Sequence, residues 1–113
     1  MKFNQKDPPR KFTVNKNVVV DIYDHGTIDL EANEQVTFIT KNGAEYDVAR
    51  KSWGFYATPS VNGRLKDFGF KTALVRNDQN RYYVMLVEDG KLDDFVRYIT
   101  DDKQEVVEWL DER

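Results

Sequence analysis

The residue types best suited to binding a ligand gather in one stretch of this chain, residues 50–65. The stretch follows neither the period of a helix nor that of a strand, and it combines three aromatic residues with three basic ones. Aromatic faces can stack on a ring, and arginine binds phosphate or carboxylate groups through paired hydrogen bonds. We therefore predict that this stretch recognises an anionic or ring-bearing ligand or a partner protein. The candidate ligand-binding residues are Arg50, Lys51, Trp53, Tyr56, Asn62 and Arg64.

A structural role explains the same composition equally well. Long connections without regular structure inside a small domain are usually functional, but they also need bulky side chains to stay ordered. In this alternative, Trp53, Phe55 and Tyr56 plug one end of a sheet, while the basic side chains bond to nearby carbonyl groups. Truncating Trp53 would then lower stability, whereas truncating a binding platform would lower affinity.

Catalytic groups are scarce in the rest of the chain. His25 is the only histidine and there are no cysteines, which excludes multi-histidine metal sites, thiolate zinc sites and thiol catalysis. Ser52 and Ser60 lie in no nucleophile elbow, and no glycine pattern matches a nucleotide-binding loop. We predict no metal, no cofactor and no identifiable catalytic residue, and the sequence favours a protein that is not an enzyme.

A pair of acids leaves a small enzyme as an alternative. A hairpin turning at Asp24-His25-Gly26 would bring Asp21 opposite Asp29, and two facing like charges favour a bound cation or a raised pKa. Such a pair would suit a carboxylate-dependent enzyme acting on a sugar. A solvated face explains the pair more simply, because surface carboxylates cost little in water.

The charge distribution argues against nucleic acid as the partner. The net charge is −3 and the isoelectric point is about 5.2, although residues 50–81 are basic and residues 88–113 acidic. Single-stranded nucleic-acid binding on a barrel-like sheet would use the same aromatic residues, but contacts to phosphates favour a basic surface. We therefore predict a small anionic ligand or a protein partner.

The length of 113 residues predicts a single domain. Residues 1–10 are polar and contain two prolines, so we expect a flexible N-terminal arm there, followed by a single α+β domain over residues 11–113. No apolar run resembles a signal peptide or a membrane span, which predicts no membrane association and a cytoplasmic location. The sequence leaves the oligomeric state open.

Strand patterns dominate the middle of the chain. They predict an α+β fold, mainly antiparallel β, with about six strands in a barrel-like or strongly twisted sheet. Two hairpins are expected, with three-residue loops at 24–26 and 41–43 that place Gly26 and Gly43 at positive φ. The second hairpin would pair Phe38 with Tyr46. Two further strands, over 68–76 and 82–88, are apolar on both alternating sets and should be covered on both faces.

The end of the chain predicts a helical cover for this sheet. The apolar residues that recur at helical spacing are Leu92, Phe95, Val96 and Ile99. Residues 102–112 fit either a helix or an edge strand, and the capping-box pair Asp102 and Glu105 favours the helix. We expect helix only after Asp89.

Overall fold

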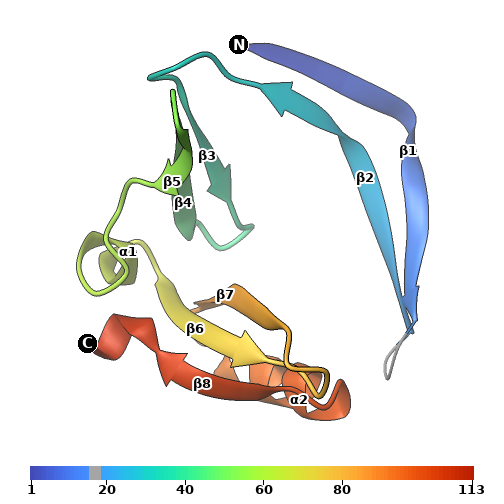
Figure 1. Ribbon diagram of the computed structural model, residues 1–113, viewed down its shortest axis with the longest axis vertical. Coiled ribbons are helices and arrows are strands. Elements are labelled where there is room, and N and C mark those ends of the chain that lie inside the picture. Colours follow the sequence, from blue (N-terminus) through green and yellow to red (C-terminus); the bar gives the residue numbers. More distant parts are fainter. Residues whose placement is uncertain (16–18) are drawn as a thin grey trace.

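The computed structural model describes residues 1–15 and 19–113, and strands predominate over helices in it (Figure 1). In chain order the elements are β1 (Lys2–Asn15), β2 (Val19–Asp29), β3 (Gln35–Ile39), β4 (Glu45–Lys51), β5 (Gly54–Ala57), α1 (Arg64–Asp67), β6 (Phe70–Arg76), β7 (Tyr82–Glu88), α2 (Leu92–Asp101), β8 (Glu105–Trp109) and the 3₁₀ turn η1 (Leu110–Glu112). No helix in these residues is long and apolar enough to cross a membrane.

The strands form three separate antiparallel sheets. Their orders are β1-β2, β3-β4-β5 and β7-β6-β8. The α+β class and the predominance of antiparallel strands are confirmed. The prediction of one barrel-like or strongly twisted six-stranded sheet is wrong, because the sheets are not closed into a barrel. Alternation within each strand defined which residues share a face, but it carried no information about which strands share a sheet.

The first sheet is a long two-stranded hairpin, β1-β2, which stands apart from the other two sheets and arches around them (Figure 1). Residues 1–10, predicted as a flexible arm, lie almost entirely in β1, and the hairpin predicted to turn at 24–26 does not form. Instead β2 runs straight through that segment and pairs with β1. Two prolines made residues 1–10 look unlike a strand, yet proline is tolerated in a strand with a free edge.

The predicted turn is an irregularity in this ladder. Gln5 pairs with Gly26 and Arg10 with Asp24, so four residues of β1 lie opposite His25 alone. The Asp24 carboxylate accepts hydrogen bonds from Lys6 Nζ (2.6 Å), Arg10 Nε (3.4 Å) and the Gly26 amide (3.1 Å). The hydrogen bond from Lys6 is the main reason that the pKa of Asp24 lies below its usual value. Gly26 has φ +143°, and a Cβ there would lie 2.2 Å from the Asn4 carbonyl oxygen, so glycine is required.

The second hairpin confirms the predicted register. Phe38 pairs with Tyr46 and Val36 with Val48, as a three-residue loop requires. Gly43 has φ +91°, which is the positive value expected for the residue closing such a loop. Beyond it, β5 adds a third strand to this sheet by pairing with β4. The stretch 50–65 is therefore not a structureless loop, because it contains the strand β5 and the start of the one-turn helix α1.

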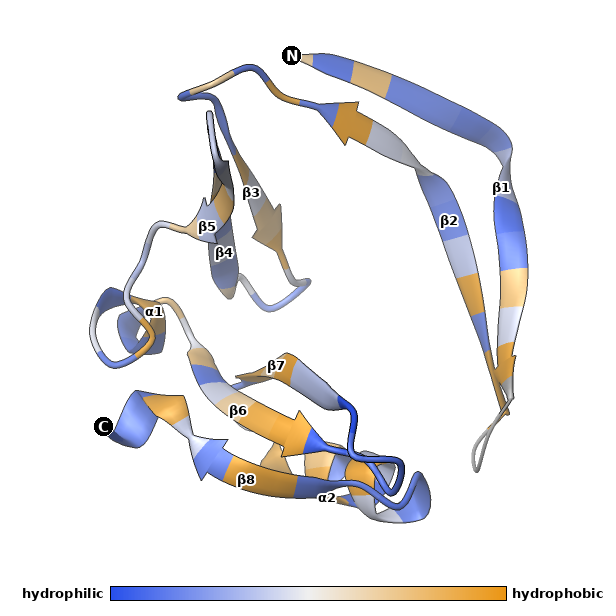
Figure 2. Ribbon diagram, in the orientation of Figure 1, coloured by the Kyte–Doolittle hydropathy of each residue, from blue (hydrophilic) through white to orange (hydrophobic). Residues whose placement is uncertain are grey.

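The third sheet has the most buried strand, β6, at its centre, between β7 and β8. Figure 2 shows how hydrophobic residues concentrate along this sheet. The helix predicted for 102–112 is wrong, because β8 pairs with the free edge of β6. Helix is also not confined to residues after Asp89, since α1 precedes β6. Residues 77–80 form the turn between β6 and β7, where the Asn80 amide donates to the Asn77 carbonyl (3.1 Å).

One apolar cluster joins the second and third sheets, and another joins α2 to the third sheet. One contains Ala44, Leu65 and Phe70, with Tyr46, Val61 and Leu86 packed on it. It joins the β3-β4-β5 sheet, α1 and one face of the β7-β6-β8 sheet. The other contains Ala73, Val75 and Ile99, with Met85, Phe95, Val106 and Trp109 packed on it. It seats α2 on the opposite face of the β7-β6-β8 sheet, as predicted, although Leu92 and Val96 of the predicted stripe remain exposed.

The prediction that both faces of the β6-β7 pair are covered is therefore only partly confirmed. β6 is buried or half-buried throughout, but the first three residues of β7 are exposed, and Val84 keeps 61% of its surface accessible. Val84 therefore lies on a part of the sheet that the described residues leave open to solvent.

We expect Gly43→Ala to lower the unfolding free energy by about 1 kcal/mol. A Cβ at Gly43 would meet no atom within 4 Å, so the whole cost comes from the positive φ. Asn42→Ala in the same turn should cost less. Urea denaturation measures both, and equal, negligible effects would contradict the three-residue loop.

We expect Ile99→Ala to destabilise the protein by about 3 kcal/mol, because Ile99 is buried between α2 and β6. Val96→Ala, on the exposed side of the same helix, should change stability by less than about 1 kcal/mol. If urea melts gave the two variants the same stability, α2 would not be the cover of the sheet.

Candidate functional site

The predicted binding residues begin at the hairpin between β4 and β5. Lys51 pairs with Gly54, so Ser52 and Trp53 form a two-residue turn between the strands. Gly54 has φ +151°, a conformation that side-chain-bearing residues rarely adopt. The aromatic residues after it have high strand propensity, which favours β5 over an irregular loop. This local chemistry projects Trp53 from the end of the sheet.

Trp53 and Tyr56 form an exposed aromatic pair. Trp53 keeps 70% of its surface accessible and Tyr56 keeps 45%. Their ring centroids lie 6.0 Å apart with planes inclined by 34°, so the two rings support each other. They do not plug the sheet, because a plug would be buried. The pair offers a ready apolar contact surface whose geometry is already set in the free protein.

Arg50 and Lys51 are engaged within the chain. Arg50 Nη1 donates to the Gly54 carbonyl (3.2 Å), and its guanidinium lies 5.4 Å from the centroid of the Phe55 ring. Lys51 Nζ donates to Asn33 Oδ1 (2.6 Å) and so ties β4 to the segment before β3. Both residues are half-buried. The structural alternative, in which basic side chains bond to local carbonyls, describes Arg50 well.

Asn62 and Arg64 follow β5 in the connection to α1. Asn62 Nδ2 donates to the Arg113 carbonyl at 3.4 Å. Arg64 is exposed, begins α1 and lies 5.4 Å from the centroid of the Phe68 ring. Pro59, by contrast, is fully buried and anchors the connection. Arg64 is thus the candidate cation in this stretch that faces solvent.

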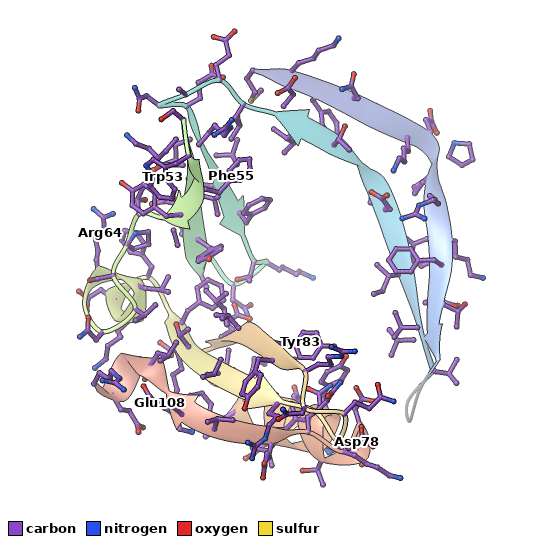
Figure 3. The ribbon with its side chains drawn as sticks, viewed as in Figure 1. Trp53, Phe55, Arg64, Asp78, Tyr83 and Glu108 are labelled. Carbon is purple, nitrogen blue, oxygen red and sulfur yellow. The ribbon has the colours of Figure 1, made fainter. Side chains whose placement is uncertain are left out.

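The six candidates do not converge on one pocket. Residues on a strand alternate between faces, and Arg50 shares its face with its partner Phe55, whereas Tyr56 lies on the other face with Ala49. Figure 3 shows Trp53 and Phe55 on opposite sides of β5. Arg50 therefore lies on the opposite face of the sheet from Tyr56. The structure retains Trp53, Tyr56 and Arg64 as the accessible part of the predicted site.

The paired acids of the alternative enzyme site are also separated. Asp21 pairs with Thr13, whose hydroxyl donates to its carboxylate (2.7 Å), and it lies 3.6 Å from Lys11 Nζ. Asp29 pairs instead with Lys2. The two carboxylates no longer face each other, because both lie on β2. Among the described residues there is also no group of three histidine, cysteine or acidic side chains that could hold a metal.

Within residues 1–15 and 19–113, the deeply buried charged side chain is that of Asp111 in η1, which keeps only 3% of its surface accessible. Its carboxylate accepts hydrogen bonds from Lys71 Nζ (2.9 Å) and the Thr72 amide (2.9 Å). The Lys71 ammonium also lies 4.8 Å from the centroid of the Trp109 ring. These contacts fasten the end of β8 to β6, so the cluster is a structural clamp.

The clamp shifts the pKa values of both of its titrating groups, Asp111 and Lys71. Burial by itself raises the pKa of Asp111, but the hydrogen bonds from Lys71 and the Thr72 amide outweigh it and hold this pKa below its usual value. The hydrogen bond to Asp111 raises the pKa of Lys71 above 10.5. Asp111 therefore stabilises the fold above the unfolded pKa of its carboxyl, and Lys71 does so until the pH rises through its folded-state pKa.

An open groove between β7 and α2 was not anticipated from sequence. It has a volume of about 500 Å³ and is lined by Leu86, Val87, Glu88, Lys91, Asp94, Phe95 and Tyr98. The helical period correctly marked Phe95, but Tyr98 falls outside the apolar stripe and gave no signal of its own. The groove holds two acids, Glu88 and Asp94, beside one lysine, and this mixed charge selects no ligand class.

Comparison of the chain with protein-family models, with curated proteins and with solved structures finds no match.

We expect Asp111→Asn to lower the unfolding free energy by about 2 kcal/mol at about pH 7, because Lys71 loses a charged partner while Thr72 keeps an acceptor. The folded-state pKa of Asp111 lies below the unfolded value of 3.8, so the wild-type advantage should decline below that value and vanish as the pH falls through the folded-state pKa. Urea melts over a pH series measure this difference.

Glu112→Gln is the matched control. Its carboxylate lies 3.6 Å from Lys71 Nζ and is largely exposed, so its loss should change stability little. A pH-independent difference between wild type and Asp111→Asn would contradict the clamp.

Proposed function

We propose that this chain is a non-enzymatic binding module that recognises a partner protein through Trp53 and Tyr56. The observation that carries the proposal is the exposure of this tilted aromatic pair at the tip of the β4-β5 hairpin. Tryptophan and tyrosine are enriched among the residues that dominate protein interfaces. The hydrogen bonds that fasten Arg50 and Lys51 below the turn keep the pair rigid, which lowers the entropy cost of binding.

The shape of this surface favours a protein over a small molecule. Small-molecule sites are concave and surround most of their ligand. Trp53 stands at the tip of a turn. Residues of the 50–65 stretch line neither the groove between β7 and α2 nor a second hollow beside Asn42 and Phe68. A projecting indole ring suits an apolar recess on a partner. Arg64, exposed at the start of α1, adds a cation that would favour an acidic rim around that recess.

The proposal predicts that Trp53→Ala separates binding from stability. The free energy of unfolding should change by less than about 1 kcal/mol, since most of the indole is already in water. Affinity for the partner should fall at least about 30-fold, as for a central interface residue. Arg64→Ala should be neutral for stability within about 0.5 kcal/mol and weaken binding less.

Capture by the immobilised wild-type protein, with Trp53→Ala as the matched bait, identifies the partner, and titration of the purified partner then measures affinity. In Trp109→Phe, Trp53 is the single remaining tryptophan. Its fluorescence should be quenched readily by acrylamide in the free protein and be protected in the complex. A partner that binds Trp53→Ala as tightly as wild type would refute the proposal.

A small anionic or ring-bearing ligand is the competing outcome. A thermal-shift screen of nucleotides, sugar phosphates and short oligonucleotides tests it, because a ligand of the native state raises the melting temperature. If a ligand raised the melting temperature of wild type but not that of Arg64→Ala or Trp53→Ala, that ligand, and not a protein, would be the partner of this site.

A further inference from the structure

The β1-β2 hairpin has an apolar face that its own chain leaves uncovered. In its outer half Phe12 pairs with Ile22 and Val14 with Val20, and paired residues share a face. Lys11, Thr13 and Asp21 lie on the other face. Phe12, Val14 and Ile22 remain exposed, and no residue of either strand belongs to the two apolar clusters. A two-stranded hairpin is only marginally stable in water unless its apolar face packs against another surface.

The rest of the chain presents an open apolar surface of its own. In the β3-β4-β5 sheet, Phe38 and Phe55 lie on the same face and are more than half exposed. In the β7-β6-β8 sheet, Leu74 pairs with the exposed Val84 on the face opposite α2. The two faces are continuous, because Tyr46 of the first and Leu86 of the second pack on the same apolar cluster.

The linker between β2 and β3 holds the hairpin away from this surface. The N-terminal amine lies 3.0 Å from the Glu34 carboxylate, which also accepts the Glu31 amide at 2.8 Å. The Asn33 amide donates to the Arg50 carbonyl (2.7 Å), and Lys51 bonds to the Asn33 side chain. Leu30 is buried at the same point. Folding the hairpin back onto its own sheets would break these contacts.

The chain exposes more surface than a compact monomer of its size, enough to be buried in a stable interface. The chain exposes 8016 Å², whereas a compact monomer of its mass exposes about 6,500 Å². Its radius of gyration is 15.6 Å, against about 13 Å for a compact chain of this length. The excess, about 1,500 Å² per chain, exceeds the roughly 800 Å² that each partner buries in a standard stable interface.

We propose that two copies of this chain exchange their β1-β2 hairpins, each docking the face of Phe12, Val14, Val20 and Ile22 on the open surface of Phe38, Phe55, Leu74 and Val84 of the other copy. A two-fold axis makes the two contacts identical and closes the assembly at a dimer. The charges agree with this arrangement, since residues 1–30 carry five bases and four acids and residues 31–113 twelve bases and sixteen acids. The exchange uses the face of β5 opposite Tyr56 and is independent of the proposed protein partner.

Light scattering after size-exclusion chromatography tests the exchange. Wild type should have about twice the 13.3 kDa mass of the chain. Ile22→Asp on the hairpin and Phe38→Asp on the open surface should each raise the dimer dissociation constant at least about 30-fold. Tyr23→Ser, on the polar face of the hairpin, is the matched control and should leave the mass unchanged. Circular dichroism checks that each variant keeps its strands, and Val14→Asp is the second hairpin variant if Ile22→Asp unfolds.

Mixing the two variants distinguishes exchange from other dimers. The Phe38→Asp chain has an intact hairpin and the Ile22→Asp chain has an intact open surface, so a mixture should recover heterodimers through one good contact. A face-to-face dimer of the open surfaces would not be recovered by mixing. A monomeric wild type at all concentrations, a dimer insensitive to Ile22→Asp, or a mixture that stays monomeric would each overturn the proposal.

Discussion

The packing of Ala44, Leu65 and Phe70 is the contact on which the arrangement of the second and third sheets depends. It joins a loop residue after the β3-β4 turn, the one-turn helix α1 and the first residue of β6, so it sets how two otherwise separate sheets meet. Because Tyr46 and Leu86 pack on the same cluster, the apolar faces of both sheets open on the same side. A change in this contact would alter the shape of that surface without altering any strand.

The exposed aromatic residues divide into two classes by the face they occupy. Trp53 and Tyr56 form a small, self-supported pair on one side of the β3-β4-β5 sheet. Phe38 and Phe55 lie on the other side, within a broad apolar surface that continues onto the next sheet. A small rigid pair suits recognition of a separate partner, whereas a broad surface suits a permanent contact. Strand alternation places these two aromatic surfaces on opposite faces of one sheet, so the two proposed contacts would not compete.

The predictable parts of the fold have local causes. The β3-β4 register was read correctly because alternation on both strands and a glycine at positive φ point to the same loop. The same reading failed at Asp24-His25-Gly26, where β1 supplies a partner from the start of the chain and the glycine serves a close backbone approach instead of a turn. Within the candidate site, composition identified Trp53 and Tyr56, but pairing with β4 turned Arg50 to the opposite face.

Neighbouring residues were enough to predict the antiparallel α+β class, the second hairpin, the β6-β7 pair and the helix α2, because each follows from local periodicity and turn chemistry. Packing in three dimensions settled the conformation of Glu105–Trp109, whose pattern suits helix and strand alike. This segment became β8 because β6 has a free edge to which it can pair. Packing also decided that the first strand pairs with the second, that three sheets form instead of one, and which apolar faces stay open. Those outcomes depend on contacts between residues far apart in the chain, which cannot be predicted from the periodicity of neighbouring residues.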